Sequence, residues 1–148
     1  MNWQTRDATI EDAAYVFDNI WDSGKIELTG FNVSRDKWLD ACIEMIVLNR
    51  CIVFEREGKV QALLGLNYAS TWFQAVNDAD MSGLTRQMRR EIPSLMDRVK
   101  DSKLSIYSLC VNSCSDKWFK LLGFVEDLNY RGQIYAGRAE RRFIVAER

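Results

Sequence analysis

Apolar residues recur at helical spacing near the start of the chain. Thr9, with Asp12 three positions later, forms a capping box, which is a common opening of a helix. The apolar stripe that follows is Ala13, Val16, Phe17, Ile20 and Trp21. We therefore predict a helix that starts after Thr9 and ends at Gly24, followed by a loop over residues 25–33.

Two further helices are predicted from the same spacing. Ser34 is a good N-cap residue, and the expected buried face behind it is Trp38, Leu39, Cys42, Ile43 and Ile46. A polar turn over residues 77–83 precedes a longer apolar stripe, formed by Leu84, Met88, Ile92, Leu95, Met96 and Val99. Pro93 lies within this stripe, so it should kink the helix or divide it in two.

Runs rich in β-branched and aromatic residues predict strands around these helices. The first covers Asn2 to Ala8. Three more runs, over residues 50–54, 59–66 and 70–76, predict an antiparallel meander, because a turn sequence at residues 55–58 joins the first two.

The last third of the chain predicts a strand, a short helix and further strands. Leu104 to Val111 is a buried-type strand that ends at a turn on Asn112. Ser115 is a good N-cap for a short helix with Trp118, Phe119 and Leu122 on its buried face. Gly123 stands where such a helix needs a left-handed residue.

The chain then returns to strand after this helix. Residues 130–138 contain two glycines and are expected to form a loop, and residues 141–146 are expected to form the last strand. The predicted order is β-α-α-β-β-β-α-β-α-β-β, in one domain that spans residues 1–148.

Composition narrows the classes of protein that this chain can be. It has 148 residues, 47% of them apolar, a single proline and a formal net charge of −1. This is an ordinary globular composition, and its charge argues against a nucleic-acid partner. Neither a membrane-spanning run nor a signal peptide is recognisable, so we expect no membrane partner and a cytoplasmic location.

The absence of histidine excludes several chemistries. Ser-His and Cys-His nucleophilic mechanisms and histidine bases are ruled out, so carboxylates, Tyr, Cys, Lys or water must move protons. The four cysteines are expected to be reduced, buried thiols. Cys110 and Cys114 are spaced like metal ligands but lack a second pair, so we expect no metal site.

The strand, Asn112, short helix and Leu122-Gly123-Phe124 exit resemble the cofactor end of GNAT acyltransferases. The whole predicted order matches that fold. The resemblance implies a mixed α/β class, with a mostly antiparallel central sheet flanked by helices on both faces. It also implies acyl transfer from acetyl-CoA or another acyl-CoA, the co-substrate, to a small-molecule or protein amine.

The resemblance also implies where the acyl-CoA would bind. The phosphate-binding pattern of the family is Gln/Arg-x-x-Gly-x-Gly/Ala, and residues 80–85 match it only at Gly83. The implied cofactor contacts are Val76, Ser82, Gly83, Leu84, Thr85, Arg86, Asn112 and Phe119. Alternatively, Ser82 is an N-cap and the arginines that follow, including Arg86, form a solvated face.

Candidate catalytic groups are few. Three carboxylates are candidate general bases. Asp78 and Asp80 lie in the turn after the third strand of the predicted meander, and Glu27 lies in the loop between the first two predicted helices. Phe119 stands where the family usually has a tyrosine that protonates the leaving thiolate, so this acid is missing. Cys110 ends the strand beside the expected thioester position, either as a nucleophile or as a small buried side chain.

Two functions follow from these residues. The first is an acyl-CoA-dependent N-acyltransferase with a degenerate phosphate loop. The second is a non-catalytic binding or assembly protein with the same fold and a protein partner. The second draws on a diffuse resemblance to small GNAT-like proteins of tailed phages, carried by residues 6–12, Trp72-Phe73, Ser82-Gly83 and residues 120–123. A phage protein of this kind would lie in the host cytoplasm or in the virion.

Overall fold

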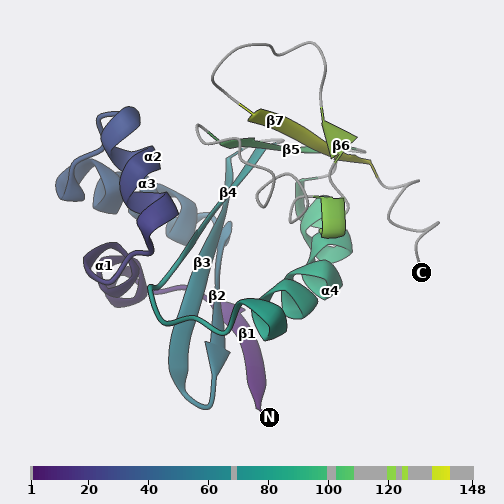
Figure 1. The fold of residues 1–148 in the computed structure, drawn as a ribbon, viewed down its shortest axis with the longest axis horizontal. Coiled ribbons are helices and arrows are strands. Elements are labelled where there is room, and N and C mark those ends of the chain that lie inside the picture. Colours follow the sequence, from purple (N-terminus) through teal and green to yellow (C-terminus); the bar gives the residue numbers. More distant parts are fainter. Residues whose placement is uncertain are drawn as a thin grey trace.

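The computed structural model describes residues 2–67, 70–99, 103–108, 120–122, 125–126 and 135–140. Its elements, labelled in Figure 1, are β1 (Trp3–Asp7), α1 (Ile10–Asp18), α2 (Asp22–Gly30), α3 (Arg35–Val47), β2 (Cys51–Arg56), β3 (Lys59–Asn67), β4 (Ser70–Ala75), α4 (Met81–Val99), β5 (Lys103–Ser108), β6 (Val125–Glu126) and β7 (Tyr135–Glu140).

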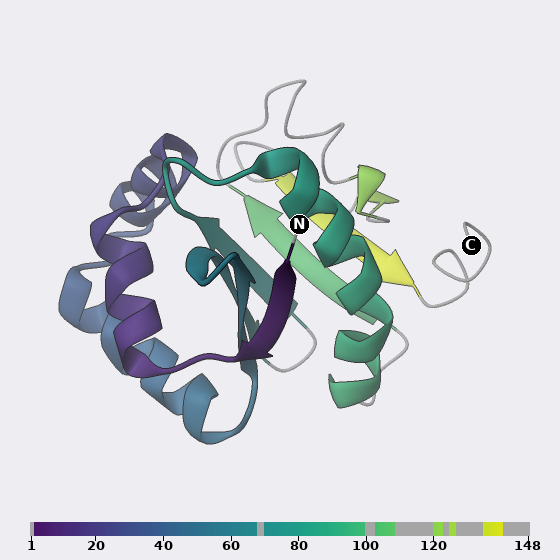
Figure 2. The ribbon, with the colours of Figure 1, turned by 90° about the horizontal axis from the view of Figure 1, so that it is seen from below.

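These strands form one seven-stranded sheet in the order β1-β2-β3-β4-β5-β7-β6. All neighbouring strands are antiparallel except β4 and β5, which are parallel. Helices α1, α2 and α3 lie on one side of the sheet and α4 lies on the other (Figures 1 and 2). The predicted fold class, a mostly antiparallel sheet with helices on both faces, is therefore confirmed.

The alternation of side chains along β2 and β3 builds two separate cores. Ile52 and Phe54 point to the face that α4 covers, where they meet Leu84, Met88 and Ile92. Cys51, Val53 and Leu63 point to the opposite face, where they belong to a cluster with Ala13 and Val16 of α1 and Trp38 and Cys42 of α3. Strands buried on both faces account for the continuous apolar runs in the sequence.

The capping box at the start of α1 is present as predicted and is part of a larger charge network. The Asp12 backbone N–H donates to the Thr9 hydroxyl, and the Asp12 carboxylate accepts from the Thr9 backbone N–H at 2.8 Å. Two guanidinium nitrogens of Arg6 donate to the same carboxylate, at 2.7 and 3.0 Å, and Arg6 also forms an ion pair with Glu55. Burial opposes ionisation of Asp12, but the bonds from Arg6 and Thr9 outweigh it and lower its pKa.

Some boundaries differ from the prediction for reasons of tertiary contact. The first helix ends at Asp18, not at Gly24, because Ile20 forms a β-bridge with Val76 at the end of β4. The segment expected as a loop over residues 25–33 is mostly α2, a helix whose one fully buried residue is Gly24. Because α2 buries so little apolar surface, its sequence has no apolar residues that recur at helical spacing.

Other details of the prediction also needed correction. Ser34 is the N-cap of α3 as expected, but Ile43 on that helix is 44% exposed. Of the two outcomes predicted for Pro93, division of the helix does not occur, because Pro93 lies inside one continuous α4. The expected loop over residues 130–138 is wrong at its end, because Tyr135–Glu140 is β7, paired with β5. The strand predicted over residues 141–146 lies outside the described residues.

None of the helices in the described part of the chain is long and apolar enough to cross a membrane.

Asp12→Asn should lower the free energy of unfolding by about 1–3 kcal/mol near neutral pH, because it removes the charge that Arg6 and Thr9 bind. Urea unfolding measures the difference. Asp18→Asn is the matched control, since its pair with Arg35 is half exposed and screened by solvent, and it should change stability little.

The Asp12 contribution should also depend on pH. Because folding lowers the pKa of Asp12, its stabilisation is complete above the unfolded value of about 3.9 and is lost as pH falls through the folded value. The gap between wild type and Asp12→Asn should therefore narrow in acid. A gap that stays constant down to the lowest pH at which both fold would contradict this role.

Candidate functional site

The strands β4 and β5 separate after a short stretch of pairing. Their parallel ladder consists of Ser70 with Ser105 and Thr71 with Ile106. Beyond Thr71, β4 runs on to Ala75, whereas β5 continues beside β7. The two central strands therefore diverge from Trp72 onwards, which leaves the edge of β4 available to groups other than a strand.

The junction between α1 and α2 pairs with the end of β4. The Trp21 backbone N–H donates to the Ala75 carbonyl at 3.0 Å, and the Asn77 N–H donates to the Asn19 carbonyl at 2.9 Å. These bonds bring the start of α2 next to the divergence. Val76, a predicted cofactor contact, is buried here in its bridge with Ile20.

The start of α4 is capped by Asp80, not by Ser82 as the alternative interpretation had it. The Asp80 carboxylate accepts from the Gly83 N–H at 3.3 Å, and its carbonyl accepts from the Leu84 N–H at 2.9 Å. Arg56 pairs with the same carboxylate at 3.2 Å. An anion of the protein itself thus sits where helix-terminal amides and the helix dipole attract negative charge.

Gly83 is required by close packing against β1. A Cβ atom at this position would lie 2.6 Å from Cζ2 of Trp3 and 2.7 Å from Oδ2 of Asp80. Such contacts are shorter than real side chains show, so any larger residue must displace Trp3 or Asp80. The packing of Trp3 and Asp80 therefore requires a glycine at position 83, whether or not phosphate binds there.

The other predicted site residues are spread around this helix. The Thr85 hydroxyl donates to the Met81 carbonyl at 2.6 Å, and Leu84 is buried in the core. Arg86 is exposed on α4, and Asp78 is exposed in the turn after β4. Asn112 and Phe119, as well as Cys110, lie outside the described residues.

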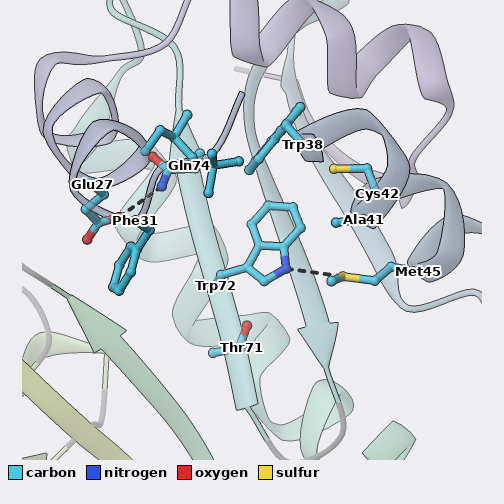
Figure 3. A pocket seen from close by; sticks show the side chains of 11 residues that line it. Glu27, Phe31, Trp38, Ala41, Cys42, Met45, Thr71, Trp72 and Gln74 are labelled. Carbon is cyan, nitrogen blue, oxygen red and sulfur yellow. Dashed lines mark hydrogen bonds between the residues drawn. The ribbon is translucent and has the colours of Figure 1, made fainter. Parts of the chain in front are cut away.

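Glu27 is the candidate base that lines a pocket. The pocket lies between α2, α3 and β4 and has a volume of about 330 Å³ (Figure 3). Glu27 accepts a hydrogen bond from Nε2 of Gln74 at 2.9 Å, and Oε1 of Gln74 accepts from the indole N–H of Trp21 at 2.9 Å. These two hydrogen bonds fix the orientation of the Gln74 side-chain amide and hold the Glu27 carboxylate at the pocket.

Gly24 makes room for this hydrogen-bond chain. A Cβ atom there would lie 2.4 Å from Oε1 of Gln74 and 2.6 Å from Ile20. Sequence reasoning missed Gln74 and assigned Gly24 to a helix end. The available signal was a glutamine inside an apolar strand, which must find a partner when it is buried, as Gln74 is.

Cysteine and metal chemistry gain no support in the described part of the chain. Cys42 lines the pocket, but burial raises the pKa of its thiol to about 12, which leaves it protonated and unreactive at neutral pH. Burial likewise raises the pKa of Cys51. The described residues contain no group of three or more potential metal-ligating side chains.

We compared this architecture with those of known proteins. The chain matches no protein-family model and no curated protein by sequence. Solved structures match it over nearly its whole length. The aminoglycoside acetyltransferase AAC(6')-Ib, in complex with paromomycin and acetyl-CoA, superposes with a TM-score of 0.75 at 12% identity, covering 100% of this chain and 98% of the other.

The PaiA N-acetyltransferase of Thermoplasma acidophilum, in complex with coenzyme A, gives a TM-score of 0.72 at 12% identity, covering 95% and 99% of the two chains. A GNAT-family acetyltransferase of Listeria monocytogenes gives 0.62 at 14% identity, covering 93% and 94%. This chain has the GNAT fold. At such identities the likeness establishes the architecture, and the predicted GNAT fold is thereby confirmed.

Gly83→Ala should destabilise the protein by about 1–3 kcal/mol, because the added methyl group meets Trp3 and the capping carboxylate. Thermal unfolding measures the loss. Ser82→Ala, one residue earlier and exposed, is the matched control and should cost far less. If Trp3→Leu in the Gly83→Ala background does not recover part of the loss, the clash with Trp3 is not its cause.

Proposed function

We propose that this protein is an acyl-CoA-dependent N-acyltransferase. The observation that supports this best is the divergence of β4 and β5 directly beside a pocket that holds a carboxylate. Proteins of the same fold have been crystallised with coenzyme A and with acetyl-CoA. Their likeness to this chain supports an acyl-CoA as the donor.

In the proposed reaction the nitrogen of an amine attacks the thioester carbonyl carbon. A C–N bond forms, the C–S bond breaks, and coenzyme A leaves as a thiolate that takes a proton from water. The proton of the amine passes to a general base. Among the three predicted bases, Glu27 lines a pocket, whereas Asp78 is exposed in a turn and Asp80 is paired with Arg56. We therefore assign this role to Glu27.

The acyl-CoA phosphates would lie at the start of α4, near the amides of Met81 and Ser82 and the guanidinium of Arg86. Asp80 opposes them, because its carboxylate occupies the Gly83 amide and adds negative charge. Arg56 compensates for that charge at 3.2 Å and could turn to a phosphate instead. Phosphate binding therefore competes with the Asp80 cap.

The same Asp80–Arg56 pair favours a second candidate function. If the cap is never displaced, the chain keeps the fold but binds no acyl-CoA, and it would then act as a binding or assembly protein, for example in a phage particle. The two functions differ in one measurable property, which is affinity for coenzyme A.

Calorimetric titration with coenzyme A and acetyl-CoA should detect binding to the wild type. Asp80→Asn should bind about 3–10-fold more tightly, because asparagine still caps the helix but no longer repels phosphate or holds Arg56. Asp97→Asn, near the far end of α4, is the charge-matched control and should bind as the wild type does. Failure of both the wild type and Asp80→Asn to bind at millimolar ligand would favour the non-catalytic function.

Glu27→Gln should lower the rate of thiol release from acetyl-CoA in the presence of an amine by about 10²-fold or more, because the amide cannot take the proton. Glu44→Gln, exposed on α3, is the control. A variant of the competing candidate, Asp78→Asn, decides the assignment. A large loss there with near-normal rates in Glu27→Gln would place the base at Asp78.

A further inference from the structure

The pocket beside Glu27 has mostly apolar walls. Leu28 and Phe31 contribute from α2, Trp38 and Met45 from α3, and Trp72 from β4. Its volume of about 330 Å³ lies in the range of small-molecule sites. A charged or hydroxyl group placed against these walls would lose its hydration without gaining hydrogen bonds, which costs free energy.

Trp72 has close contacts on several sides in these walls. It lies opposite Gly65 in the β3–β4 ladder, and a Cβ atom on Gly65 would lie 2.2 Å from its ring. Its indole N–H donates to the sulfur of Met45 at 3.1 Å, and its ring meets Trp38 edge-to-face at 4.8 Å between centroids. The indole nitrogen of Trp72 is thus occupied by Met45, and the rest of the ring forms an apolar wall of the pocket.

Two of the polar side chains that line the pocket, Glu27 and Gln74, lie together at one side of this ring. Figure 3 shows Glu27 and Gln74 beside Phe31 on one side of Trp72, with Met45 and Cys42 on the other. Gln74 is held by Trp21 and donates to Glu27. The pocket therefore combines one negatively charged corner with aromatic and aliphatic walls.

We propose that the acyl acceptor of this protein is an apolar amine with a single cationic group, such as an arylalkylamine, and that Trp72 determines this specificity. This inference rests on the proposed function. The ring or alkyl body of the acceptor packs against Trp72 and its neighbours, and its ammonium lies at the Glu27 corner. Before transfer the bound ammonium loses one proton to solvent water. Glu27 is then still ionised when the neutral amine attacks the thioester, and it takes the second proton in the step described above.

The first test measures amine binding to the full chain without acyl-CoA. Calorimetry would compare 2-phenylethylamine, its neutral counterpart 2-phenylethanol, and spermidine, which has several charges and no ring. The amine should bind about tenfold or more tightly than either alternative. Equal or tighter binding of spermidine would overturn the proposal.

Variants separate the two parts of the pocket. Trp72→Ala should weaken 2-phenylethylamine about tenfold, and Trp72→Phe, which retains a smaller ring, should weaken it less. If Trp72→Ala does not fold by circular dichroism, Trp72→Phe and Met45→Ala take its place, and both should weaken binding. Glu27→Gln should remove the preference for the amine over the alcohol. Ile26→Ala, on the exposed side of α2, is the control and should bind as the wild type does.

A turnover assay distinguishes this inference from the function on which it rests. Binding of 2-phenylethylamine through Trp72 without acetyl transfer from acetyl-CoA would contradict the proposed function and leave the amine pocket in place. Acetylation of spermidine but not of 2-phenylethylamine would contradict the specificity and leave the function in place. Unchanged binding in every Trp72 and Met45 variant that folds would overturn the role of the aromatic wall.

Discussion

The pairing of residues 19–21 with the end of β4 is the constraint on which the rest of the site depends. It consists of the Ile20–Val76 bridge and the backbone bonds from Trp21 to Ala75 and from Asn77 to Asn19. These contacts are possible because β5 leaves β4 after two residue pairs. They separate α1 from α2, place Trp21 over Gln74, and so bring Glu27 to the pocket. A backbone interaction at a strand edge thereby sets the position of a carboxylate on a helix.

The two candidate binding regions differ in how their charges are arranged. At the start of α4 a carboxylate is already paired, with Arg56 on one side and the Gly83 amide on the other. In the pocket the carboxylate of Glu27 accepts a hydrogen bond from the side-chain amide of Gln74. The first arrangement stabilises the fold and opposes an incoming anion, whereas the second suits an incoming cation. Donor and acceptor sites of the proposed reaction therefore lie under different electrostatic constraints.

Local signals were sufficient wherever a residue acts on its own segment. The Thr9–Asp12 capping box and the Ser34 N-cap could be predicted, because each bonds to a backbone group within three residues. Local signals were insufficient where distant contacts decide. Gly24 does not end the first helix as expected, and it makes room for Gln74, which is far away in sequence. Gly83 remains a predicted cofactor contact, but its close packing against Trp3 could not be read from its own segment. Asp80 departs from the phosphate-binding pattern of the family, but its ion pair with Arg56, which is 24 positions away in the sequence, could not be predicted from the sequence.

The sequence by itself determined the order of most elements, the mixed class of the fold and the absence of histidine chemistry, because periodicity, capping residues and composition are local properties of a chain. The tertiary structure alone decided that residues 22–30 are a helix, that Asp80 fills the start of α4, and that Glu27, Gln74 and Trp72 line one pocket. The physical reason is that these features depend on which strand edges meet, where β4 and β5 part, and how closely side chains approach a glycine. Such distances arise only when segments far apart in sequence are packed together.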